Sequence, residues 1–189
     1  MLIKSPDGQA LMVGPRGEIL TTSTTRSFKE YASRNGDGYN IVFDTTLTSA
    51  ASSALIYIKN QDTSYSLVLD SLLISAGTST GGSGLSELAT YYSPTGGTII
   101  SDATALTSVN RNAGNTTPIS AIVYSGGTGK TATGGTVTYK GFMSSSFATE
   151  GSGLTLPNGT SIALVYTPPT GNTSQRVLAT VICYFDKIG

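Results

Sequence analysis

Apolar and polar residues alternate with a period of two along most of the chain after residue 38. Tyr39, Ile41 and Phe43, for example, fall on one face of an extended segment. A period of two is typical of a half-buried β-strand. The pattern predicts strands at residues 39–47, 54–58, 67–75, 88–92, 98–100, 106–110, 119–124, 136–142, 161–166 and 177–185.

Short runs of Gly, Pro, Asn and Asp separate these predicted strands, and the pattern predicts no helix. Strands that follow one another without helices between them exclude a parallel α/β sheet and favour an antiparallel sandwich. The composition agrees, because only 12% of the residues are charged. Helix surfaces normally carry many Glu, Lys and Arg residues. The sequence therefore predicts an all-β fold.

Residues 1–34 differ from the remainder of the chain and are predicted to form an N-terminal arm. Two short apolar pieces, residues 10–13 and 18–20, flank a Gly- and Pro-containing turn and are expected to form a small hairpin. We expect the arm to pack on a neighbouring protein, with an unanchored tail as the alternative. Residues 35–189 would then form a single sandwich domain. The candidate contact residues of the arm are Leu11, Val13, Arg16, Leu20, Arg26 and Phe28.

Charge and cysteine usage exclude several partners. The 11 basic and 11 acidic residues cancel and form no basic run, so we expect no binding to nucleic acid. No apolar stretch is long enough to cross a membrane as a helix, and the first residues lack the apolar core of a signal peptide. We therefore expect synthesis in a cytoplasm. The single Cys183 lies in an apolar run and is predicted to be a buried, unreactive thiol.

Three short motifs resemble catalytic or ligand-binding sites, but each lacks a necessary partner. Residues 77–81 match G-x-S-x-G around Ser79, yet the chain has no histidine to activate that serine. Lys130 lies in a G-K-T sequence, but Tyr124 occupies the position where a phosphate-binding loop needs its first glycine. Residues 35–38 resemble a calcium loop with Asp37 as its only carboxylate. We expect no enzymatic activity, no cofactor and no metal.

The aromatic residues suggest one candidate ligand or subunit interface. Tyr91 and Tyr92 are adjacent within a predicted strand, so their side chains would face opposite sides of the sheet. One of them would then be free to contact a partner. Together with Arg111 in the asparagine-rich segment 110–115, they form the only cluster that the sequence offers for carbohydrate binding.

The C-terminal third resembles the closing strands of jelly-roll proteins from tailed-phage virions, particularly head decoration (cement) proteins. The similar phrases are Leu156-Pro157-Asn158-Gly159-Thr160, which enters a strand, and Thr167-Pro168-Pro169-Thr170-Gly171-Asn172, which leads into the last one. Residues 8–13 and 20–22 resemble the arm with which many of these proteins begin. The resemblance implies a jelly-roll sandwich on the capsid exterior, a homotrimer bound to the major capsid protein, and no catalytic residue.

The residues themselves point to assembly as well. Apolar residues run almost unbroken through 164–166 and 177–185, so both faces of these strands are expected to be covered, one of them by a neighbouring subunit. A surface with little charge and zero net charge favours association. Two alternatives remain: another virion position such as a tail fibre or baseplate, and a carbohydrate-binding sandwich that recognises a host surface.

Overall fold

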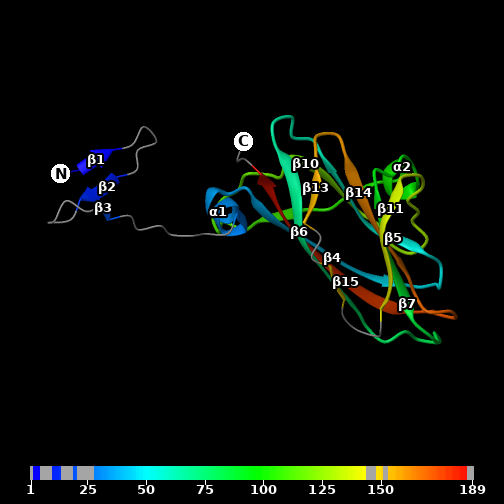
Figure 1. The fold of residues 1–189 in the computed structure, drawn as a ribbon. Coiled ribbons are helices and arrows are strands. Elements are labelled where there is room, and N and C mark those ends of the chain that lie inside the picture. The colour runs from blue at the N-terminus through cyan, green and yellow to red at the C-terminus, as the bar shows by residue number, and fades with distance from the viewer. Residues whose placement is uncertain are drawn as a thin grey trace.

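Two antiparallel β-sheets packed face to face form the body of the molecule (Figure 1). The computed structural model describes residues 2–4, 10–13, 19–20, 28–143, 148–150 and 153–186. The predicted all-β sandwich is confirmed. No helix in the described part of the chain is long and apolar enough to cross a membrane.

The first sheet has β14 near its centre and is called the β14 sheet. Its strand order is β11 (Thr136–Met143), β7 (Ser86–Tyr92), β14 (Ser161–Thr167), β5 (Ser53–Asn60), β10 (Ala121–Ser125) and β8 (Thr104–Ala105). The second, the β15 sheet, has the order β12 (Ala148–Glu150), β6 (Ser66–Ala76), β15 (Gln175–Asp186), β4 (Gly38–Leu47) and β9 (Ser108–Asn110), and β13 (Leu154–Leu156) also pairs with β6.

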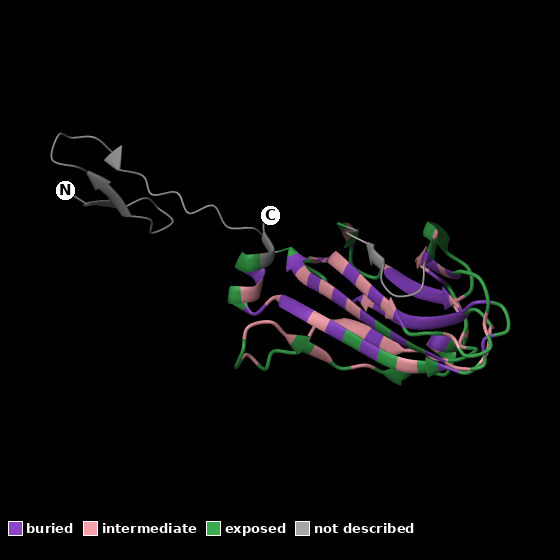
Figure 2. Cartoon of the chain, turned by 90° about the horizontal axis from the view of Figure 1, so that it is seen from below, coloured by how far each residue is buried: buried purple, intermediate pink, exposed green. Residues whose placement is uncertain are grey.

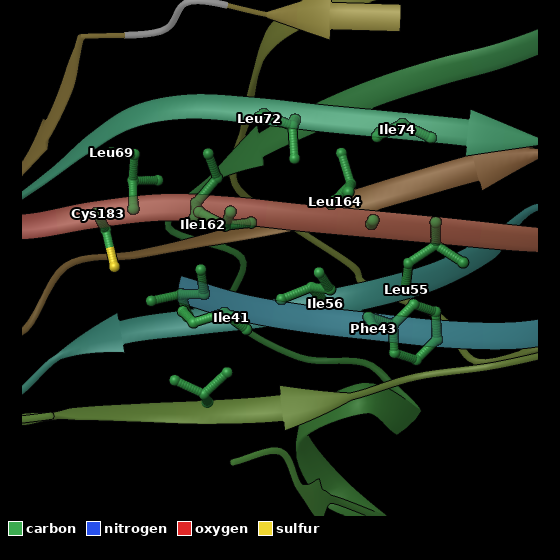
Figure 3. Close-up of a cluster of buried hydrophobic side chains, with 14 of the residues drawn as sticks. Ile41, Phe43, Leu55, Ile56, Leu69, Leu72, Ile74, Ile162, Leu164 and Cys183 are labelled. Atoms are coloured by element: carbon green, nitrogen blue, oxygen red, sulfur yellow. The ribbon is translucent and has the colours of Figure 1, made fainter. Parts of the chain in front are cut away.

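The main core lies between the two sheets and follows the period of two. Along β15, every second residue from Gln175 to Phe185 is buried, while the residues between them are more exposed. Figure 2 shows this alternation along the long strands. Tyr39, Ile41 and Phe43 of β4 are all buried, as predicted, and Tyr39 packs edge-on against Phe185 with ring centroids 6.2 Å apart. Figure 3 shows Ile41 and Phe43 within this cluster.

The strand predicted at residues 98–100 is wrong, because these residues belong to the short helix α2 (Thr98–Ser101). Gly97 has φ 109°, and its carbonyl accepts hydrogen bonds from the N–H groups of Ile100 and Ser101. The Ile99 side chain is completely buried. The N–H of Ile99 donates to the carbonyl of Thr131, so contacts with a distant segment hold this turn in place. Local alternation of apolar residues cannot distinguish such a buried turn from a strand.

A second helix, α1 (Phe28–Asn35), lies within the segment assigned to the arm, where the sequence predicted no helix. It contacts β4 and β15 and buries Ala32. The helix ends at Gly36, whose φ is 79°, and the N–H of Asp37 donates to the carbonyl of Ala32 at 2.8 Å. This is a Schellman end. The segment 35–38 that resembled a calcium loop therefore serves to end a helix.

The N-terminal strands form a small sheet of their own. β1 (Leu2–Lys4), β2 (Ala10–Val13) and β3 (Ile19–Leu20) are antiparallel in the order β1-β2-β3, and Met12 lies opposite Leu20. The predicted arm contacts are distributed as follows: Leu11 and Val13 lie on β2, Leu20 lies on β3, Phe28 begins α1, and Arg16 and Arg26 lie outside the described residues.

Candidate interaction surface

The outer face of the β14 sheet is covered by the protein's own chain. Between β7 and β11, α2 and residues 126–133 lie against this face and are called the cover, whereas β8, β9 and β10 in the same stretch are strands of the two sheets. Ile99 packs there in a second apolar cluster with Tyr57, Ala163 and Val165. Tyr57 also stacks on Tyr124, with ring centroids 5.7 Å apart and an interplanar angle of 17°. Because of this cover, every residue of β5 except Lys59 is buried.

Backbone hydrogen bonds fix this cover to β5. The N–H of Ala54 donates to the carbonyl of Lys130 at 2.7 Å, and the N–H of Gly126 donates to the carbonyl of Leu55 at 2.7 Å. A Cβ atom on Gly126 would lie 1.7 Å from the Ala54 carbonyl oxygen, so only glycine permits this approach. The ammonium of Lys130 pairs with the carboxylate of Asp102. The G-K-T segment therefore belongs to the cover and has a structural explanation.

The outer face of the β15 sheet carries apolar side chains that remain exposed. Val42 on β4, Val109 on β9 and Leu178 on β15 are 52%, 60% and 39% exposed. The strand register places them on one face, since Thr180 lies opposite both Val42 and Leu73. Cross-strand partners project from the same side of a sheet. We call this surface the open face; its apolar members are Val42, Val68, Leu73, Val109, Leu178, Ile182 and Tyr184.

One ion pair, between Asp44 and Arg176, lies on the open face, and its two charges cancel. The Arg176 guanidinium donates from Nη2 to Asp44 Oδ2 at 2.6 Å and from Nε to Oδ1 at 3.0 Å. The Arg176 hydrogen bonds hold the pKa of the Asp44 carboxyl below its ordinary value. Both side chains are exposed. The pair therefore adds no net charge to the open face, where polar residues such as Asn40, Thr46 and Thr180 lie between the apolar side chains.

The structure separates the residues of the predicted carbohydrate cluster. Tyr91 packs against the apolar cluster under α2, whereas Tyr92 packs against the main core, so the two rings face opposite sides as expected. Both lie on β7 in the β14 sheet, while Arg111 follows β9 in the β15 sheet and donates its N–H to the carbonyl of Gly38 at 2.8 Å. They do not form one site.

The asparagines of the same segment have structural roles. The Asn110 amide donates from Nδ2 to the carbonyl of Gly36 at 2.7 Å, and its Oδ1 accepts from the N–H of Asn112 at 2.9 Å. Asn112 in turn donates from Nδ2 to the carbonyl of Arg34 at 2.8 Å, behind the end of α1. These contacts hold α1 against the loop after β9. They occupy the side-chain amides of Asn110 and Asn112, which would otherwise be available to bind a sugar.

The G-x-S-x-G segment is also held by structural contacts. Ser79 donates from Oγ to Asn172 Oδ1 at 2.5 Å, and the buried Asn172 donates from Nδ2 to the carbonyls of Leu47 and Ser49 at 3.1 and 3.0 Å. Ser79 thus joins two loops at one end of the sandwich. Within the described residues, no group of three His, Cys, Asp or Glu side chains is arranged to hold a metal ion.

Sequence reasoning predicted part of the open face and missed the rest. The unbroken apolar run through β15 indicated a second covered face, which includes Leu178 and Ile182. Val42 and Val109 gave no separate signal, because a single valine in a strand is common and only the register shows that they are neighbours. No family model matches the chain, and no curated protein matches it either.

Proposed function

We propose that this protein is a non-enzymatic structural subunit that binds other protein through its open face, and more specifically a decoration (cement) protein of a phage head. The observation that carries the proposal is the difference between the two outer faces of the sandwich. The chain covers β5 and β14 on one of them with α2 and residues 126–133, and leaves Val137 and Phe142 of the edge strand β11 exposed. It leaves Val42, Val109 and Leu178 exposed on the other. Exposed apolar side chains that gather on one face are typical of protein interaction sites.

The strand pairing supports a fold of the jelly-roll type. With β8 to β10 set aside, β4 pairs with β15, β5 with β14, β6 with β13 and β7 with β11. The first strand thus pairs with the last and the second with the next to last, and successive strands alternate between the two sheets except at β7 and β11, which are neighbours in the β14 sheet. This nesting is the arrangement expected when two Greek keys form one sandwich. It agrees with the resemblance of the C-terminal third to decoration proteins.

In this proposal the protein acts mechanically. Homo-oligomers, with three copies expected, would sit on the capsid exterior and bury apolar area at the junctions between capsomers, with the major capsid protein as partner. The small N-terminal sheet would supply a second contact in addition to that of the open face. Burial of apolar area stabilises such contacts by about 25 cal/mol per Å² before the entropy of association is subtracted.

The test combines light scattering with co-sedimentation on candidate phage shells. The wild-type protein is expected to be oligomeric and to sediment with shells. Val42→Glu should reduce the mass, the sedimentation or both, because it places a charge on the open face. Leu85→Glu is the matched control, since Leu85 is 57% exposed but lies in the loop before β7. A wild-type monomer that ignores shells, or equal behaviour of the two variants, would contradict the proposal.

A further inference from the structure

A cavity of about 150 Å³ lies between the two sheets. It is lined from both sides of the sandwich: β5, β7, β11 and β14 contribute from the β14 sheet, and β6, β13 and β15 contribute from the β15 sheet. Figure 3 shows five of the lining side chains together in the core. The lining residues are Ile56, Ile58, Leu69, Leu72, Thr90, Thr138, Leu154, Ile162, Leu164 and Val181.

The walls of the cavity are apolar. Every described lining residue is Ile, Leu, Val or Thr, and the Oγ1 atoms of Thr90 and Thr138 are hydrogen-bonded to each other at 2.8 Å. Buried water needs two or more polar partners, which such walls do not offer over most of their area. An apolar occupant would instead regain the dispersion contacts that an empty cavity forfeits.

The cavity is accessible from one side. Ile56 and Ile58, at its base, are each only 1% exposed, whereas Thr138 is exposed and Leu154 is half-buried. Thr138 lies on β11 at the edge of the β14 sheet, and Leu154 lies on β13, which pairs with the outer side of β6. The mouth is therefore at the edge of the sandwich between β11 and β13.

We propose that this cavity is a binding site for a small apolar molecule of about the size of benzene. Cavities of about 150 Å³ lined by aliphatic residues remain dry and accept benzene or xenon in other proteins. The Thr90–Thr138 hydroxyl pair lies within the lining. These two hydroxyl groups are the only polar side-chain atoms among the described lining residues, and they are already bonded to each other. The site should therefore prefer hydrocarbons to polar ligands. This inference is independent of the assembly role proposed above.

The experiment is a titration of the full-length protein with benzene, followed by the NMR signals of its Ile, Leu and Val methyl groups. Saturable shifts are expected for cavity residues such as Ile162 and Leu164, and not for Val42 or Leu178 on the open face. Xenon serves as a second probe of the same space. Binding of xenon without benzene would overturn the proposal, because the space would then be too small for an organic molecule. Shifts confined to the open face would overturn it as well.

Two variants of β11 separate the cavity from the rest of the strand. Thr138→Phe places a ring at the mouth and should weaken benzene binding at least tenfold. Val137→Phe is the matched control, because Val137 lies opposite Tyr91 on the outer face and does not line the cavity. It should bind benzene as the wild type does. Equal loss in both variants, or unchanged binding in Thr138→Phe, would contradict the assignment. If Thr138→Phe fails to fold, Leu154→Ala tests the same site, since a wider mouth should increase the saturable shifts.

Discussion

Replacement of Tyr166 by phenylalanine tests the polar network that joins the two sheets. Tyr166 on β14 is completely buried, and its hydroxyl is hydrogen-bonded to Ser86 Oγ at 2.7 Å and to Gln175 Oε1 at 3.1 Å. Ser86 lies on β7, whereas Gln175 lies on β15 in the opposite sheet and donates from Nε2 to the carbonyl of Gly77 at 2.8 Å. Tyr166→Phe removes one oxygen from this chain of contacts and leaves the ring in place.

The expected loss follows from the partners that remain. Ser86 and Gln175 are both buried, so neither can regain a hydrogen bond to solvent without rearrangement. A buried polar group left without its partner costs about 1–3 kcal/mol. For a chain of this size each kcal/mol lowers the thermal midpoint by about 2–4 °C, so the midpoint should fall by roughly 2–12 °C. Tyr139→Phe, which alters a 38% exposed residue on β11, should change stability by less than about 0.5 kcal/mol.

The pH dependence provides a second readout of the same contact. Burial raises the pKa of the Tyr166 hydroxyl above its ordinary value of 10.0, against the opposing effect of its hydrogen bonds with Ser86 and Gln175. The raised pKa means that the neutral hydroxyl stabilises the fold below pH 10.0, and that this contribution is lost as the pH rises further. The advantage of wild type over Tyr166→Phe should therefore shrink above pH 10.0. Equal midpoints at pH 7, or a constant difference up to pH 11, would refute the reasoning.

Three further predictions concern the cover, the cysteine and the open face. Gly126→Ala should cost about 3 kcal/mol or more in urea denaturation, because its Cβ would meet the Ala54 carbonyl; a loss under about 1 kcal/mol would contradict this. Burial raises the pKa of the Cys183 thiol to about 12, so alkylation at pH 8 should be at least about 100-fold slower in folded than in urea-unfolded protein; equal rates would contradict the burial. The pKa of Asp44 is lowered by Arg176, so the stability that this pair adds is present above pH 3.8 and lost below it. Any advantage of wild type over Asp44→Asn should vanish in acid, and a larger advantage at pH 3 would refute the assignment.

The sandwich was predictable from the sequence because several of its long strands bury one face and expose the other. In β4 and β15 the buried residues recur at every second position, so the local pattern already carries the geometry. β12 and β13 were missed because three residues are too few to show a period. The helices were missed for a different reason. α1 has only eight residues, so the i, i+3, i+4 spacing of Phe28, Tyr31 and Ala32 is too short to establish a helical period. The helix depends on the contact of Ala32 with the body of the molecule and on Gly36 at its end, which are properties of the folded chain.

The candidate surface was less predictable, because it depends on contacts between distant residues. The sequence indicated apolar residues on both faces of β14 and β15, but it did not indicate what covers them. The cover on β5 and β14 depends on hydrogen bonds between distant residues, such as that between Ala54 and Lys130. The local sequence pattern does not predict such a contact. The cavity could not be predicted from the sequence for the same reason, since its volume depends on how side chains from both sheets pack.

The two outer faces together support the proposed role in assembly. Strands with apolar residues on both sides are favourable only when both sides are removed from water. For β5 and β14 the protein provides this cover with α2 and residues 126–133, and Gly126 approaches β5 at a distance that only glycine allows. On β4 and β15 the exposed Val42 and Leu178 lie beside an ion pair, Asp44–Arg176, that adds no net charge. A partner that covers Val42, Val109 and Leu178 would supply for the β15 sheet what α2 supplies for the β14 sheet, so Val42→Glu should weaken assembly without the loss of stability expected from Gly126→Ala.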